Sequence, residues 1–161
     1  MTYSLETQSA ASILPLKGVC KMGNVRTFKA KTLVPGKVIG PALITRERLS
    51  FQGFTDPNRG IFTAPQTELQ GKSFKGAVLI FTSGKGSSAG ASTLDLACRL
   101  GNSPAAIINL QIDSFIAAGC VLEDIPLVQV EDPSIFDQVK NGDIIMVDAD
   151  KGEIKCDVTS Y

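Results

Sequence analysis

The chain has 161 residues, enough for one compact domain with a substantial hydrophobic core. It carries 16 basic and 16 acidic residues, and this balance argues against a nucleic-acid-binding surface, where a basic excess is usual. No apolar run reaches the roughly 18–20 residues that a membrane-spanning helix needs, and the first residues lack the features of a targeting signal. We therefore expect a cytoplasmic protein that binds neither nucleic acid nor membrane.

Two residue types limit the chemistry available to the chain. Histidine is absent, which removes the commonest general base and the commonest metal ligand. Close cysteine pairs of the C-x-x-C kind are also absent, so we expect structural thiols and no metal site or disulfide framework in this chain. The cysteines are Cys20, Cys98, Cys120 and Cys156. Any catalysis must then use hydroxyls, carboxylates, lysine or groups of a partner.

The chain divides into an N-terminal extension, residues 1–24, and one domain, residues 25–161. The extension has a mixed pattern, and we expect it to pack on the domain or on a partner. The domain begins with β segments that we expect to be interrupted at Pro35-Gly36 and at Gly40-Pro41. A long polar connection follows over residues 46–60, and loops of this length are often functional.

Strands and helices alternate in the second half of the chain. Residues 77–82 predict a buried strand, and the next helix is expected over about 93–100, with Ser92 as its cap and Gly101 at its end. This alternation predicts right-handed βαβ crossovers and a partly parallel sheet, hence an α/β fold with a β/β/α plan. The further expected elements are a strand at 104–110, a helix from Asp113 to Gly119, a strand at 125–130, a helix from Asp132-Pro133, and a hairpin of 143–148 with 153–157.

A loop rich in glycine and serine, Gly84–Ser92, joins the strand at 77–82 to the helix after it. Backbone N–H groups and the helix dipole converge at such a junction and favour a bound anion. Ser87 and Ser88 add two hydroxyls, and Lys85 adds a positive charge. The loop therefore predicts a binding or catalytic site.

Several known loop types can be compared with this one. The Walker A pattern fails, because Lys85 is followed by Gly86 and no glycine stands at the required upstream position. Gly84, Gly86 and Ala89 match a relaxed dinucleotide fingerprint, but too little chain remains for a full Rossmann sheet. A swivelling phosphohistidine domain needs a histidine, which the chain lacks. The remaining alternative is a glycine-rich turn between strand and helix that binds no ligand.

Five segments in order give a closer match than any of these loops. They resemble the small, swivelling subunit of aconitase X over roughly residues 25–157. The resemblance implies a swivelling β/β/α domain, hydro-lyase chemistry, and a heterodimer with a large subunit that holds an iron–sulfur cluster. The segments are Ser50-Phe51, Asp56-Pro57, Gly84-Lys85-Gly86-Ser87-Ser88, Pro104-Ala105-Ala106-Ile107-Ile108 and Gly142-Asp143-Ile144-Ile145-Met146-Val147-Asp148.

The resemblance also implies roles for the residues of the serine loop. In the wider aconitase superfamily a Gly-Ser-Ser-Arg loop lies over the substrate, and its first serine acts as the base. Ser87 is then the catalytic base, while Gly86 and Ser88 orient the substrate carboxylate. A desolvated Lys85 beside Ser87 would further stabilise the serine alkoxide.

The arginine of the superfamily loop has no counterpart here, because Ala89 stands at its position. The grip on the substrate carboxylate must therefore come from elsewhere, and Lys85, Arg46 and the large subunit are the candidates. For Arg46, however, a solvated loop residue is the favoured interpretation. Asp56 either binds substrate or only caps a turn before Pro57.

The family implies two substrates, cis-3-hydroxy-L-proline and mevalonate 5-phosphate. We expect the first, converted to pyrroline-2-carboxylate, because a phosphorylated carboxylate demands several cations and the serine loop contains only Lys85. The N-terminal extension also resembles that of the longer bacterial small subunits. The alternatives are mevalonate 5-phosphate, and a non-catalytic module that uses the loop to hold an anion.

Overall fold

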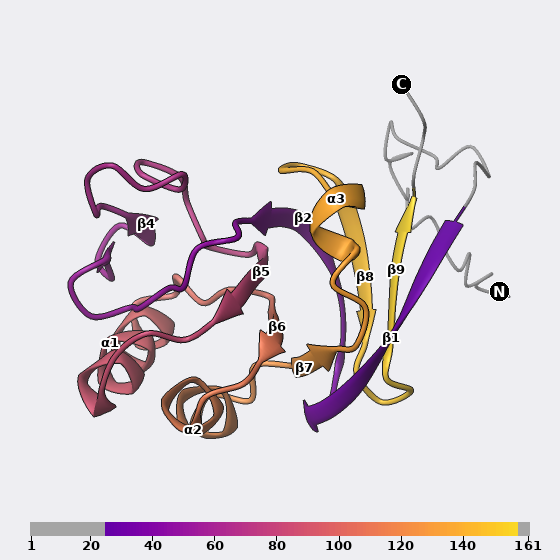
Figure 1. Cartoon of the computed structure of the whole chain (residues 1–161). Coiled ribbons are helices and arrows are strands. Elements are labelled where there is room, and N and C mark those ends of the chain that lie inside the picture. The colour runs from indigo at the N-terminus through magenta and orange to yellow at the C-terminus, as the bar shows by residue number, and fades with distance from the viewer. Residues whose placement is uncertain (1–24, 158–161) are drawn as a thin grey trace, which may run out of the picture.

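The computed structural model describes residues 25–157, which form a closed barrel with two helices packed on one side (Figure 1). The extension expected at residues 1–24 lies outside the described residues. Neighbouring strands around the barrel are β1 (Val25–Val34), β7 (Leu127–Val130), β6 (Ala106–Gln111), β5 (Val78–Ser83), β2 (Lys37–Ile44), β8 (Ile144–Asp148) and β9 (Glu153–Asp157), which pairs again with β1.

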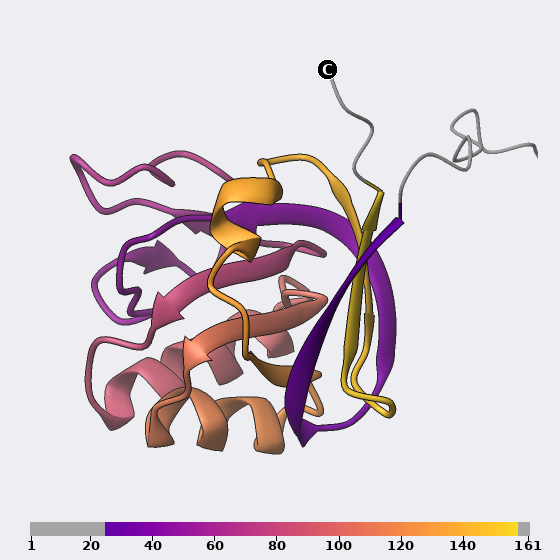
Figure 2. The ribbon, with the colours of Figure 1, turned by 45° about the vertical axis from the view of Figure 1, so that its right-hand side comes forward.

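Both strand directions occur in the barrel. The contiguous strands β2, β5, β6 and β7 pair in parallel, whereas β1, β8 and β9 pair antiparallel with their neighbours. Helices α1 (Ser88–Arg99) and α2 (Ser114–Leu122) are the crossovers from β5 to β6 and from β6 to β7, and they lie side by side below the parallel strands in Figure 2. The predicted α/β fold with a partly parallel sheet is confirmed.

The parallel strands bury both of their faces. On β5, Leu79 and Phe81 face the helix layer, while Val78 and Ile80 face the barrel interior, and all four are fully buried. Two-sided burial explains why this strand reads as a continuous apolar run. The short helix α3 (Ile135–Gln138) packs Ile135 into the interior cluster.

The connection between β2 and β5 is a small lobe whose aromatic side chains join the core cluster between the sheet and the helices. It contains the two-stranded pair β3 (Thr55–Asp56) and β4 (Ile61–Phe62). Phe74 packs edge-on against both Phe51 and Phe62, with ring centroids 5.7 and 5.4 Å apart. The description of this region as a polar connection was wrong in part, because Phe51 is buried in the core beneath the helix layer.

Strand β2 continues through Gly40-Pro41, where the sequence analysis expected an interruption. Lys37 to Pro41 pair with β8, and the pairing with β5 begins at Ala42. Pro41, which has no N–H to donate, therefore stands where the strand changes partners. A side chain on Gly40 would lie 2.9 Å from the Gly76 carbonyl oxygen, so close backbone approach explains that glycine. The interruption at Pro35-Gly36 is confirmed.

Both main helices differ in length from the prediction. Helix α1 begins at Ser88 with Ser87 as its N-cap, several residues before the expected cap at Ser92. Helix α2 has the expected N-cap, Asp113, but runs past Gly119 to Leu122. A side chain at Gly119 would lie 3.1 Å from the Leu94 side chain, so this glycine serves close helix packing and does not end the helix.

The remaining predicted elements are confirmed with small shifts in their bounds. Strands β5, β6 and β7 correspond to the strands expected at 77–82, 104–110 and 125–130, and β8 with β9 forms the expected hairpin. The helix expected from Asp132-Pro133 begins later, at Ile135 with Ser134 as its N-cap. Asp132 begins the turn that leads into it, since its carboxylate accepts the backbone N–H of Ser134 at 2.9 Å.

Phe74 lies at the centre of the lobe, so its replacement tests how far the lobe contributes to stability. Because Phe74 is fully buried, we expect Phe74→Ala to lower the free energy of unfolding by about 3–5 kcal/mol. Phe115→Ala removes the same ring from a position that is 39% exposed, and it should cost less than about 1.5 kcal/mol. Urea unfolding of both variants makes the comparison, and equal losses would contradict the burial argument.

Candidate active site

The serine loop leaves the end of β5 and enters α1 through residues 84–87. Its backbone is tied to the lobe, because Leu49 donates to the Ser83 carbonyl at 3.1 Å and the Lys85 N–H donates to the Leu49 carbonyl at 2.7 Å. Gly86 has φ of +151°, and a side chain there would lie 2.8 Å from Ser50 Oγ. The loop is therefore held by backbone hydrogen bonds and fits closely over Ser50.

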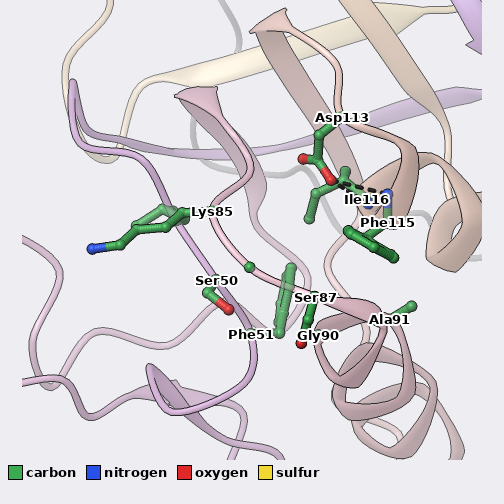
Figure 3. A pocket seen from close by; sticks show the side chains of 11 residues that line it. Ser50, Phe51, Lys85, Ser87, Gly90, Ala91, Asp113, Phe115 and Ile116 are labelled. Carbon is green, nitrogen blue, oxygen red and sulfur yellow. Dashed lines mark hydrogen bonds between the residues drawn. The ribbon is translucent and has the colours of Figure 1, made fainter.

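A small pocket that opens to solvent lies beneath this loop (Figure 3). Its walls come from the lobe, the serine loop and the N-terminal ends of α1 and α2. The residues that line it are Leu49, Ser50, Phe51, Lys85, Gly86, Ser87, Gly90, Ala91, Asp113, Phe115 and Ile116. Segments far apart in the sequence thus meet at the carboxyl edge of the parallel strands, which is where α/β folds commonly place their ligands.

Ser87 stands at the positive end of α1. Its backbone is extended, with φ −127° and ψ −177°, and its side chain makes no capping hydrogen bond. The first helical turn contains no acidic residue, so nothing in it offsets the dipole. Ser87 and Ser88 are both exposed. This arrangement can bind an anionic group on the first N–H groups of α1 while it leaves the Ser87 hydroxyl free to react.

Lys85 is arranged differently from the expectation. Its side chain is exposed and points away from Ser87 in Figure 3, with Nζ 5.3 Å from the centroid of the Phe54 ring. The expected desolvated lysine beside the serine is therefore wrong, because an exposed ammonium group keeps its hydration. Lys85 can still attract an anion toward the loop.

Arg46 and Asp56 do not line the pocket. Arg46 forms an ion pair with Asp137 and lies over the Phe136 ring, 5.6 Å from its centroid, so it belongs to the surroundings of α3. Asp56 shapes the turn between β3 and β4, where its carboxylate accepts the Asn58 N–H at 2.9 Å. A substrate contact by either residue stays a prediction.

Three residues at this edge were not selected as site residues from the sequence, although Ser50 belongs to one of the five segments that carry the resemblance. Ser50 is buried, and its hydroxyl donates to the Gln52 carbonyl at 3.1 Å. Arg48 donates from Nε to Ser83 Oγ and from a terminal nitrogen to the Gly84 carbonyl, both at 3.0 Å. Asp113 was identified only as a helix cap. Tertiary contacts of the lobe and of the N-terminal end of α2 bring all three to the loop, and no pattern of neighbouring residues predicts these contacts.

The cysteines among the described residues lie away from the pocket lining. Burial raises the pKa of the Cys120 thiol to about 12, and burial also raises the pKa of Cys98. Both thiols are therefore protonated at pH 7 and are poor nucleophiles. Within residues 25–157, no group of three or more potential metal-ligating side chains is present. In the same range, no helix is long and apolar enough to cross a membrane.

Sequence comparison relates the chain to known proteins. The profile of the aconitase X swivel domain matches residues 27–156. The phosphomevalonate dehydratase small subunit of Methanothrix thermoacetophila is 46% identical over 122 residues, which make up 76% of this chain and 88% of that protein. Its namesake in Methanosarcina acetivorans is 38% identical over 128 residues, which make up 80% of this chain and 89% of that protein.

Structural comparison agrees with the sequence. Aconitase X of Thermococcus kodakaraensis, in its holo form, matches with a TM-score of 0.76 and 33% identity over 81% of this chain and 98% of that chain. A 3-isopropylmalate dehydratase chain of Methanocaldococcus jannaschii matches with a TM-score of 0.53 and 18% identity over 78% of this chain and 84% of that chain. The second likeness shows a common fold alone.

Gly86 offers a test of the close fit between the serine loop and Ser50. We expect Gly86→Ala to lower the free energy of unfolding by about 2–3 kcal/mol, because the methyl group meets Ser50 Oγ and φ lies in a region that favours glycine. Gly71→Ala is the matched control, since Gly71 has φ of +78° but open space around it, and it should cost about 1 kcal/mol. Urea unfolding measures both, and equal costs would show that Ser50 does not constrain the loop.

Proposed function

The chain belongs to the aconitase X swivel-domain family, and we propose that it is the small subunit of a two-chain dehydratase acting on mevalonate 5-phosphate. The proposal rests on the relatives reported above, which are named phosphomevalonate dehydratase small subunit. Their matches span most of both chains. The hydro-lyase activity expected from the sequence is confirmed at the level of the family.

The comparisons favour the alternative substrate over cis-3-hydroxy-L-proline. The sequence favoured cis-3-hydroxy-L-proline because Lys85 was the one cation found in the serine loop. In the structure Arg48 is hydrogen-bonded to the Gly84 carbonyl, so a second cation stands at the root of the loop. Two cations suit a substrate with both a carboxylate and a phosphate group. The second argument for cis-3-hydroxy-L-proline was the N-terminal extension, and these residues lie outside the described range.

In the proposed reaction Ser87 takes a proton from the carbon next to the substrate carboxylate. The carboxylate lies against the first N–H groups of α1, where the helix dipole stabilises negative charge by up to about 2 kcal/mol. Ser88, the first helical residue, contributes its hydroxyl and its backbone N–H to the same anion. Donors fixed in this way before the reaction supply a large part of the rate acceleration in many enzymes.

We assign the departure of the hydroxyl group to the large subunit. The family implies an iron–sulfur cluster, but the described residues do not fit one, because they offer no group of three metal-ligating side chains. The cluster is therefore proposed to reside on the partner. The cytoplasmic location of the complex stays a prediction from the sequence.

Reconstitution tests the proposed function. We expect the purified chain alone to turn over no substrate, because it supplies a base and anion donors for only half of the reaction. Mixing it with the large subunit should give dehydration of mevalonate 5-phosphate, measured by the appearance of the unsaturated product. cis-3-Hydroxy-L-proline is the comparison substrate. Dehydration of hydroxyproline, with mevalonate 5-phosphate untouched, would reverse the substrate assignment.

Serine substitutions test the role of the loop in the assembled complex. Ser87→Ala should lower kcat by about 10³- to 10⁴-fold, because it removes the group that accepts the substrate proton. Ser88→Ala should lower kcat by about 10²-fold, the usual effect of losing one fixed donor. Ser92→Ala is the matched control, as an exposed serine one turn further along α1, and it should leave kcat unchanged. If Ser87→Ala keeps most of its kcat, the base lies elsewhere.

A further inference from the structure

The outer face of the antiparallel strands is polar at one end and apolar at the other. Residues that stand opposite one another in antiparallel strands point to the same face of the sheet. At the polar end Lys37 pairs with Asp148 at 3.2 Å. In the same part of the face, Lys29 and Lys155 pair with Glu153 at 3.5 and 3.2 Å. Charged side chains on the solvent side are the usual arrangement for such a sheet.

The other end of this face carries four exposed apolar side chains, which we call the apolar wall. Ile39 on β2 stands opposite Met146 on β8, and Pro41 stands opposite Ile144. Ile39 is 68% exposed, Ile144 is 55% exposed and Met146 is 38% exposed. Neighbouring exposed apolar side chains of this kind mark a surface that contacts another segment or another molecule. The side chains of residues 25–157 leave the apolar wall uncovered.

The apolar wall does not belong to the face that carries the serine loop. Strand β2 pairs with β5 from Ala42 onward, so the wall lies at the amino end of β5. The serine loop leaves the carboxyl end of that strand. Helices α1 and α2 also lie elsewhere, because Figure 2 shows them beneath the parallel strands, away from β8 and β9. A partner that contacts the serine loop therefore has no need to cover the apolar wall.

The N-terminal extension joins the domain beside this wall. Strand β1 begins at Val25, which is 57% exposed and stands opposite Asp157 on β9. In the β8–β9 pair, Ile145 stands opposite Cys156, so the register continued by one residue brings Asp157 opposite Ile144. Val25 and Ile144 therefore stand in one row across β1, β9 and β8. The extension enters the domain at the end of that row.

The extension has the length and the apolar residues needed to cover the wall. Its sequence gathers Ile13, Leu14, Leu16 and Val19 within residues 13–19. The residues between Val19 and Val25 can span roughly 20 Å when extended. Crossing from β1 over β9 and β8 to β2 takes three strand spacings, about 14 Å. Residues 13–19 can therefore reach both strands of the wall from the start of β1.

We propose that residues 13–19 of the extension lie across the outer faces of β8 and β2 and cover the apolar wall. The sequence left open whether the extension packs on the domain or on a partner, and the position of the wall beside Val25 favours the domain. The matched family profile begins at residue 27, so this contact would be an addition to the shared domain. The proposal concerns a face outside the pocket and does not depend on the substrate.

Met146 reports whether the apolar wall is covered, because peroxide oxidises an accessible methionine to its sulfoxide. In the full chain, we expect Leu14→Asp combined with Leu16→Asp to raise the oxidation rate of Met146 at least about three-fold, since charged side chains do not stay on an apolar surface. Leu5→Asp is the matched control in the extension, and it should leave the rate unchanged. Mass spectrometry of the peptide that contains Met146 measures the rate, and the Tm of each variant confirms a folded barrel. Equal rates in the wild type and the double variant overturn the proposal.

A substitution on the wall tests the same contact from the other side. We expect Ile39→Asp to release the extension, so that trypsin cleaves after Lys17 and Lys21 at least about three-fold faster than in the wild type. Leu33→Asp is the matched control, because Leu33 is also exposed, at 47%, and lies on β1 outside the wall. Cleavage after Lys17 and Lys21 at the wild-type rate in folded Ile39→Asp overturns the proposal.

Protein concentration and the large subunit distinguish the extension from other occupants of the wall. Protection by the chain's own extension should be the same over about a hundred-fold range of concentration and without the large subunit. Protection of Met146 that appears only at high concentration indicates a second copy of the chain. Protection that appears only on mixing with the large subunit indicates that partner. Either of these two results overturns the proposal.

Discussion

The short passage from β5 into α1 is the constraint on which the site depends. Strand β5 is paired on both sides, with β2 and β6, so its end is fixed. The chain must then enter α1 within residues 84–87, and the hydrogen bonds to Leu49 hold that segment against the lobe. Because β5 and β6 are parallel, the N-terminal ends of α1 and α2 open at the same edge of the sheet. Ser87 and Asp113 meet at one pocket for this reason.

Local patterns in the sequence were sufficient for the strands and for the position of the loop. Residues close together in the sequence determine whether a segment is a buried strand and where a helix begins. The sequence therefore predicted the apolar strand β5, the hairpin of β8 and β9, and the helix cap at Asp113. The start of α1 was predicted too late, because the residues after Ser92 have a typical capping pattern. Ser87 is the N-cap because the segment that leaves β5 is held against the lobe and enters the helix early. Gly119 was predicted to end α2, but it lies inside the helix, where the absence of a side chain allows close contact with α1.

The candidate site was predictable only in part, for the same reason. The serine pair follows from a loop motif that is continuous in the sequence. Arg46 and Arg48 stand two positions apart in one loop, yet Arg46 pairs with Asp137 near α3 and Arg48 braces the serine loop. Nothing in the local sequence distinguishes them, because the distinction depends on the bridge between Leu49 and Gly84. Ser50 and Asp113 likewise reach the loop through tertiary contacts alone.

The account assigns one half of a dehydration to this chain: binding of an anion at the start of α1 and removal of a proton by Ser87. A crystal structure of the assembled complex with mevalonate 5-phosphate bound tests this assignment most directly. The account predicts the substrate carboxylate on the first N–H groups of α1 and Ser87 Oγ about 3–3.5 Å from the carbon next to that carboxylate. A substrate bound away from the serine loop, with another side chain in contact with that carbon, would contradict it.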